Sequence, residues 1–251
     1  MLIVLFTALG VGGATLIGAL IGFIFKNISP KITDMLLGFA GGIMLSAAIV
    51  GLILPSLESG EGYAIIITIL GIILGAILLN IIDKVVPHLH KPIGEEIENH
   101  PKGKKTLNKT MLFVLAIAIH NFPEGMAAGV GFSAGDNVGA ITIAVGIALQ
   151  NIPEGMIIIA PLLAMGMSKK KTLLIASLTG LVEVVGTFVG YFAIHVSANV
   201  LPFLLAFAGG TMLYVISDEM IPEMRRNGNE TLATYSLIIG FCVMLAIDFL
   251  I

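Results

Sequence analysis

Two closely similar polar hexapeptides interrupt the apolar sequence, HNFPEG at 120–125 and QNIPEG at 150–155. In a helix, the first and fifth residues of each would share one face, with the asparagine on a neighbouring edge. The candidate ligands are His120, Asn121 and Glu124 in the first copy and Gln150, Asn151 and Glu154 in the second. An imidazole with carboxylates and amides is a nitrogen and oxygen set suited to Zn²⁺ and to harder or borderline divalent ions.

Each hexapeptide also contains a proline. Pro123 and Pro153 have no N–H, so they leave the carbonyls of Ile119 and Leu149 without a helical donor and should kink the helix beside the carboxylate. Inside a membrane, such backbone is tolerated where it is buried in protein or lines a cavity. The freed carbonyls could then bind a cation or water.

A third acid, Glu183, lies in the middle of another apolar stretch, LTGLVEVVGTFVG. An ionised acid at the centre of a membrane helix costs about 2.5 to 3.5 kcal/mol on insertion scales. No Lys or Arg lies in the same part of these stretches, so a cation is the natural counter-charge for three glutamates. The alternatives are protonated carboxyls that hydrogen-bond neighbouring helices, or a proton relay without metal.

The elements that must position these residues are membrane helices. The chain is 57% hydrophobic and only 12% charged, whereas soluble proteins have about 25% charged residues. Crossing a bilayer takes about 20 apolar residues. Eight such runs are present, at about 2–25, 33–54, 63–86, 110–132, 138–166, 171–195, 199–222 and 232–251. We therefore predict an all-α polytopic membrane protein with a single transmembrane domain, 1–251.

The basic residues indicate the orientation. All 13 Lys and Arg fall in or beside alternate loops, which the positive-inside rule places in the cytoplasm. Both termini should then be extracytoplasmic. The longest cytoplasmic loop, 87–109, contains His88, His90 and His100 beside several glutamates. It is either a plain solvated loop or a weak metal-sensing loop.

The sequence also contains two similar heptapeptides. FAGGIML at 39–45 lies in the second run and FAGGTML at 207–213 lies in the seventh, and these two runs cross in opposite directions. This pattern predicts an inverted-topology repeat, helices one to three against six to eight, with helices four and five between them. Chance similarity between Gly- and Ala-rich helices is the alternative.

Enzymatic chemistry has little support. Cys242 is the only cysteine, so a thiolate metal site or a disulfide framework is excluded. The H-E-x-x-H arrangement of zinc proteases is missing, and no serine lies in a nucleophile pattern. We expect no enzyme and no resident cofactor. A metal-binding sensor without flux and an intramembrane metalloprotease remain as alternatives.

With both hexapeptides, eight runs and a His-bearing loop after the third, the chain resembles the ZIP (Zrt-, Irt-like) family of divalent-metal transporters. Gln150, where many members have histidine, together with GLVEVVG around Glu183, is most similar to the bacterial GufA-type branch. The resemblance covers essentially the whole chain. It implies two adjacent metal positions: a first formed by His120, Glu124, Gln150 and Glu154, and a second formed by Asn121, Glu124, Asn151, Glu154 and Glu183.

The resemblance further implies import of Zn²⁺, and often Fe²⁺, Mn²⁺ or Cd²⁺, across the cell membrane by elevator-like alternating access. Ser46 is similar in placement to an outer gate residue. Candidate exit-path ligands on the cytoplasmic side are Asp83, His88, His90, Asp218, Glu219 and Glu223, although solvated helix ends would explain these residues equally well. The expected partners are divalent metal ions and the lipid bilayer, with a homodimer as an option and no nucleic acid.

Overall fold

The computed structural model describes residues 1–25, 28–59, 62–85, 109–133, 137–164, 166–193 and 200–250. Within these ranges, every regular element is a helix. The loop predicted at 87–109, with His88 and His90, lies outside the described residues except for Lys109, where a helix begins.

The helices match the predicted apolar runs. They are α1 (Leu2–Ile24); α2 (Pro30–Ser46), η1 (Ala47–Ile53) and α3 (Leu54–Ser59); α4 (Ala64–Val85); α5 (Lys109–Ser133); α6 (Asn137–Ile157) and α7 (Ile159–Ala164); α8 (Lys169–Ala193); α9 (Leu201–Val215), η4 (Ile216–Met220) and α10 (Ile221–Met224); and α11 (Glu230–Leu250). Among the described residues, seven helical spans are long and apolar enough to cross a membrane. The remaining predicted span is α5, whose 25 residues extend about 37 Å. The prediction of an all-helical polytopic membrane protein is confirmed.

Three details differ from the prediction. The second span begins at Pro30 rather than 33, because Ser29 Oγ accepts a hydrogen bond from the Ile32 N–H at 3.3 Å and a proline suits the first helical position. The fifth run is broken by a turn at Ile158. The second and seventh spans continue through the π-helical segments η1 and η4. Such segments leave no separate signal in apolar periodicity.

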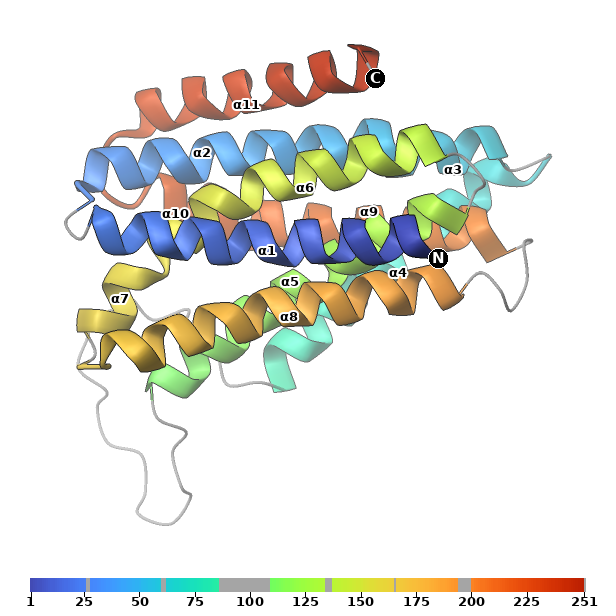
Figure 1. Ribbon diagram of the computed structural model, residues 1–251. Coiled ribbons are helices and arrows are strands. Elements are labelled where there is room, and N and C mark those ends of the chain that lie inside the picture. Colours follow the sequence, from blue (N-terminus) through green and yellow to red (C-terminus); the bar gives the residue numbers. More distant parts are fainter. Residues whose placement is uncertain are drawn as a thin grey trace.

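The helices form two groups. In the first bundle, α5 packs on α8, and α1 packs on both α6 and α8; in the second bundle, α2 packs on α11 and α4 packs on α9. Figure 1 shows α11 along α2 on one side of the molecule and α5 along α8 on the other. The N- and C-termini lie at the same end (Figure 1). An even number of crossings requires this arrangement.

Contacts in the second bundle agree with the predicted inverted repeat. Four glycines bring the backbones of paired helices together so closely that a Cβ atom would collide with a carbonyl oxygen. The contacts are Gly42 with Leu237 and Gly240 with Phe39 in the α2–α11 pair, and Gly210 with Ile72 and Gly75 with Phe207 in the α9–α4 pair. Because Phe39 and Phe207 begin the two FAGG motifs, both pairs use one packing scheme.

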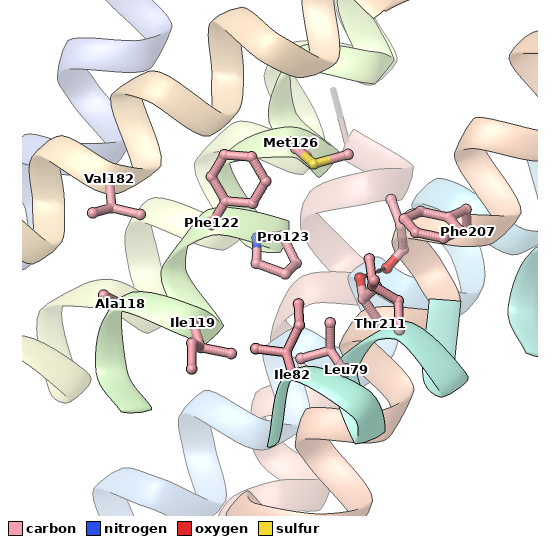
Figure 2. A pocket seen from close by; sticks show the side chains of 12 residues that line it. Leu79, Ile82, Ala118, Ile119, Phe122, Pro123, Met126, Val182, Phe207 and Thr211 are labelled. Carbon is pink, nitrogen blue, oxygen red and sulfur yellow. Dashed lines mark hydrogen bonds between the residues drawn. The ribbon is translucent and has the colours of Figure 1, made fainter. Parts of the chain in front are cut away.

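Between the two bundles lies an apolar cavity of about 310 Å³. Figure 2 shows Phe122, Pro123 and Met126 of α5 facing Leu79 of α4 and Phe207 of α9 across it. The described residues that line it include no ionisable side chain.

Candidate metal site

The two hexapeptides lie on neighbouring helices of the first bundle. Both α5 and α6 remain helical through Pro123 and Pro153, and the two helices contact each other. Asn121, Glu124, Gln150 and Asn151 are each at most 3% exposed, whereas Glu154 is only partly buried. Glu183 of α8 is fully buried as well. Buried polar groups of this kind require hydrogen bonds, counter-charges or a bound ion.

The glycine that ends each hexapeptide determines which helix approaches it. A Cβ on Gly125 would collide with the backbone of Glu183 in α8, and a Cβ on Gly155 would collide with the backbone of Thr15 in α1. Because each glycine follows the hexapeptide glutamate directly, α8 and α1 pass close to Glu124 and Glu154. The site is therefore formed by all four helices of the first bundle.

The Glu183 carboxylate is the centre of a hydrogen-bond network. Thr15 Oγ1 donates to Oε1 at 2.7 Å, and Asn121 Nδ2 donates to the same oxygen. Asn151 Nδ2 donates to Oε2 at 2.5 Å. Three donors from α1, α5 and α6 thus fix one carboxylate of α8.

The orientation of both asparagine amides follows from their second contacts. Asn121 Nδ2 also lies 3.4 Å from the Thr179 carbonyl oxygen, and Asn151 Nδ2 lies 3.2 Å from the Val11 carbonyl oxygen. A flipped amide would place its oxygen against a carbonyl and a carboxylate, so the NH₂ group must face Glu183. The Asn151 Oδ1 atom is then left buried without a hydrogen-bond donor.

Other buried atoms of the site are also unsatisfied. Glu124 Oε2 and both amide atoms of Gln150 have no hydrogen-bond partner, and the Gln150 amide faces Glu124 without reaching hydrogen-bonding geometry. An unsatisfied buried polar group costs about 1–3 kcal/mol. Three of the unsatisfied atoms are oxygen acceptors that a cation would satisfy, Glu124 Oε2, Gln150 Oε1 and Asn151 Oδ1, whereas Gln150 Nε2 is a donor.

The electrostatics also favour a cation. Glu124 interacts repulsively with both Glu154 and Glu183, and Glu183 interacts repulsively with Glu154. Among the described residues, however, no three His, Cys, Asp or Glu side chains are grouped closely enough to hold a metal by themselves. The amide oxygens of the hexapeptides and the His120 imidazole, whose position is not described, are the further ligands that the sequence predicts.

Several predicted residues lie partly or wholly outside the described structure. The backbone of His120 is in α5, one turn before Glu124, but its side chain is not among those described. The same holds for Asp83 near the end of α4. His88 and His90 lie outside the described residues altogether.

The structure places the remaining pathway candidates on the π-helical segments or beside them. Ser46 ends α2 where η1 begins, is fully buried, and has no hydrogen-bond partner for Oγ. Asp218 and Glu219 lie in η4. Glu223 is exposed and accepts a hydrogen bond from Arg226 Nη1 at 3.1 Å, as a solvated helix end would. π-Helical segments frequently mark functional sites, which supports Ser46, Asp218 and Glu219 more than Glu223.

Sequence reasoning missed Thr15. A signal was present, because Gly12, Gly18 and Gly22 of the first run have the same spacing as the glycines of the sixth, which are Gly180, Gly186 and Gly190. Aligning the two sets places Thr15 at the position of Glu183. An isolated threonine in an apolar run gave no other reason to single it out.

Comparison with known proteins gives a consistent result. The family model described as ZIP zinc transporter matches residues 94–248. The chain is 40% identical to the zinc transporter GufA of Myxococcus xanthus, with 94% of each chain covered. It is 39% identical to the zinc transporter ZIPB of Bordetella bronchiseptica, covering 94% of this chain and 77% of the relative. With the zinc transporter ZupT of Chlorobaculum parvum it shares 36% identity over 93% of this chain and 91% of the relative.

Proposed function

Since the chain belongs to the ZIP zinc transporter family, we propose that it transports divalent metal cations, Zn²⁺ foremost, across the membrane into the cytoplasm. The observation that carries this proposal is the set of buried, mutually repelling carboxylates beside unsatisfied oxygens where the two hexapeptides meet. Its relatives are named zinc transporters, so the expectation that the chain is not an enzyme is confirmed by its family.

The first metal position is formed by the hexapeptide side chains. Glu124 and Glu154 supply the negative charge that replaces part of the hydration shell of the ion, and His120 and Gln150 complete the coordination. Imidazole, carboxylate and amide ligands suit Zn²⁺, and Fe²⁺, Mn²⁺ and Cd²⁺ are the other candidate substrates. The unsatisfied Glu124 and Gln150 oxygens support this assignment.

The second, adjacent metal position is formed around Glu183. Asn121 and Asn151 contribute to it, and Glu124 and Glu154 bridge the two positions. The direct hydrogen bonds of both amides to Glu183 support a common site for these three residues.

Transport requires that the site opens to each side of the membrane in turn. The close glycine contacts with backbone atoms lie within each bundle, whereas the cavity of about 310 Å³ lies between the bundles. This distribution supports an elevator-like motion in which the first bundle slides as a unit against the second. Ser46 would control entry from outside. Asp83, Asp218, Glu219 and Glu223, with His88 and His90, would receive the ion on the cytoplasmic side.

The proposed setting is the cell membrane, with both termini outside and the 87–109 loop in the cytoplasm. The outer faces of α4 and α11 are rich in exposed apolar side chains such as Ile66, Ile73 and Ile239. These faces contact lipid, and a homodimer would form through one of them.

The test is uptake of radioactive zinc into proteoliposomes by the wild type and by Glu124→Ala. We expect saturable uptake that the substitution abolishes, while Glu230→Ala, which removes an exposed acid outside the proposed pathway, retains it. Unlabelled Mn²⁺, Fe²⁺ and Cd²⁺ as competitors rank the substrates. Tight zinc binding without flux would instead make the chain a metal sensor, and Glu124-dependent cleavage of a membrane peptide would make it a protease.

A further inference from the structure

Thr15 and Glu183 occupy equivalent positions in the two repeats. Gly12 and Gly180 face each other where α1 crosses α8, and Thr15 and Glu183 each follow three residues later. Three residues further on, Gly18 touches the backbone of Ile152 and Gly186 touches that of Phe122. Ile152 and Phe122 are themselves the third residues of the two hexapeptides, so the equivalence extends through all four helices.

The position of Thr15 is set by backbone packing. Its carbonyl oxygen lies against Gly155, where no side chain could fit. The side chain is 2% exposed, and its hydroxyl donates to Glu183 Oε1 at 2.7 Å. Helix packing, rather than side-chain adjustment, therefore brings this hydroxyl to the carboxylate.

The hydrogen bonds divide the two carboxylate oxygens of Glu183 into different roles. A carboxylate oxygen has about two lone pairs. Oε1 accepts from both Thr15 and Asn121 and is filled, whereas among the described side chains only Asn151 donates to Oε2. One lone pair of Oε2 is left to bind a cation.

We propose that Thr15 is a positioning residue for the second metal position: by filling Oε1 it holds the Glu183 carboxylate so that Oε2 is the oxygen offered to the ion. The inference rests on the proposed function, because it deepens the assignment of Glu183. In metal sites, outer partners that orient a ligand typically change affinity by about 10- to 100-fold when they are lost.

The test is calorimetric titration of the purified full-length protein with Zn²⁺, comparing the wild type with Thr15→Val, Thr15→Ser and Glu183→Gln. Valine has nearly the shape of threonine but lacks the hydroxyl, and serine keeps the hydroxyl. We expect two binding events in the wild type and loss of the weaker one in Glu183→Gln. Thr15→Val should weaken that event roughly tenfold and leave the tighter one unchanged. Thr15→Ser should behave as the wild type.

Thermal unfolding of the metal-free variants separates positioning from packing, because a positioning role leaves the melting temperature of Thr15→Val close to that of Thr15→Ser. If Thr15→Val does not fold, Thr15→Ala takes its place. An unchanged weaker event in Thr15→Val, or equal weakening in the serine variant, overturns the proposal. The proposal about Thr15 is also overturned if the wild type shows a single zinc-binding event and Glu183→Gln leaves that event intact. The proposed transport through Glu124 and Glu154 would not be affected by this result. Absence of both binding and flux in the wild type removes the proposed function itself.

Discussion

In the first bundle, α1 and α8 make equivalent contacts with α6 and α5, yet α1 carries Thr15 where α8 carries Glu183. The π-helical segments differ in the same sense, because η1 is entirely apolar whereas η4 contains Asp218 and Glu219. The repeats therefore share a backbone scheme and differ in charge. In the proposed transport cycle, a symmetric framework would allow two equivalent conformations, and asymmetric charge would give the ion different surroundings toward each side.

The contacts between the bundles differ as well. Beside α5, the space facing α4 is the cavity of Figure 2. Beside α6, the buried Met244 of α11 packs directly on Gly146, which also lies near Ile43. One half of the repeat is closed against the second bundle and the other is open, as the proposed alternating access would require of either end state.

The largest effect is expected from the glycines that follow the hexapeptide glutamates. Gly125→Leu and Gly155→Leu should each prevent normal folding, because their side chains would collide with the backbones of α8 and α1. Overpacking typically costs about 1–3 kcal/mol, and more where backbone must move. The measurement is yield and melting temperature of the purified protein. Gly13→Leu is the matched control, since nothing lies within 4 Å of its Cβ position, and similar losses in that variant would contradict the explanation.

The next largest effect, on zinc binding, is expected from exchanging Thr15 of α1 and Glu183 of α8. Glu183→Thr should remove the weaker zinc-binding event, and adding Thr15→Glu should restore it in part, because the two positions are equivalent relative to Asn121 and Asn151. Calorimetric titration of the single and double variants measures both. A double variant no better than Glu183→Thr alone would show that the repeats are equivalent in backbone packing only.

Filling the open cavity should slow transport without changing the site. Ala118 lines the cavity, and Ala118→Leu should lower the maximal uptake rate several-fold by obstructing the motion of the first bundle, with zinc affinity retained. Uptake and binding are measured on the same preparation, with Ala160→Leu on the exposed surface of α7 as control. If Ala118→Leu also lowered the zinc affinity, its effect on uptake would come from a disturbed metal site rather than from an obstructed motion.

The smallest effect is expected from the first position of the hexapeptides, where His120 can be protonated and Gln150 cannot. Zinc binding needs a neutral imidazole and ionised carboxylates, so affinity and uptake should fall as pH is lowered from neutral to mildly acidic values. Gln150→His should tighten zinc binding at neutral pH and steepen this decline, because protons must leave two imidazoles. Zinc titrations across this pH range measure the slope. Uptake that rises on acidification would point to proton coupling.

The sequence was sufficient for the helical spans because about 20 consecutive apolar residues are needed to cross a bilayer, and few other structures require them. It was also sufficient for the two buried acids, Glu124 and Glu183, and for the partly buried Glu154, because an acid is costly in such runs. The turn at Ile158 and the π-helical segments were not predicted, because both preserve the apolar character of their runs. The role of Thr15 was not recognised: the matching glycine spacings align it with Glu183, but they do not reveal the hydrogen bond between helices far apart in the chain.

The hydrogen bond between Thr15 and Glu183 joins residues that are 168 positions apart. During synthesis, both hexapeptides enter the membrane before α8 does. Until α8 is inserted, the chain lacks Glu183, and Gly12 of α1 has no partner helix. The proposed second metal position therefore cannot assemble on an incomplete chain, and it would form only after the sixth span is inserted.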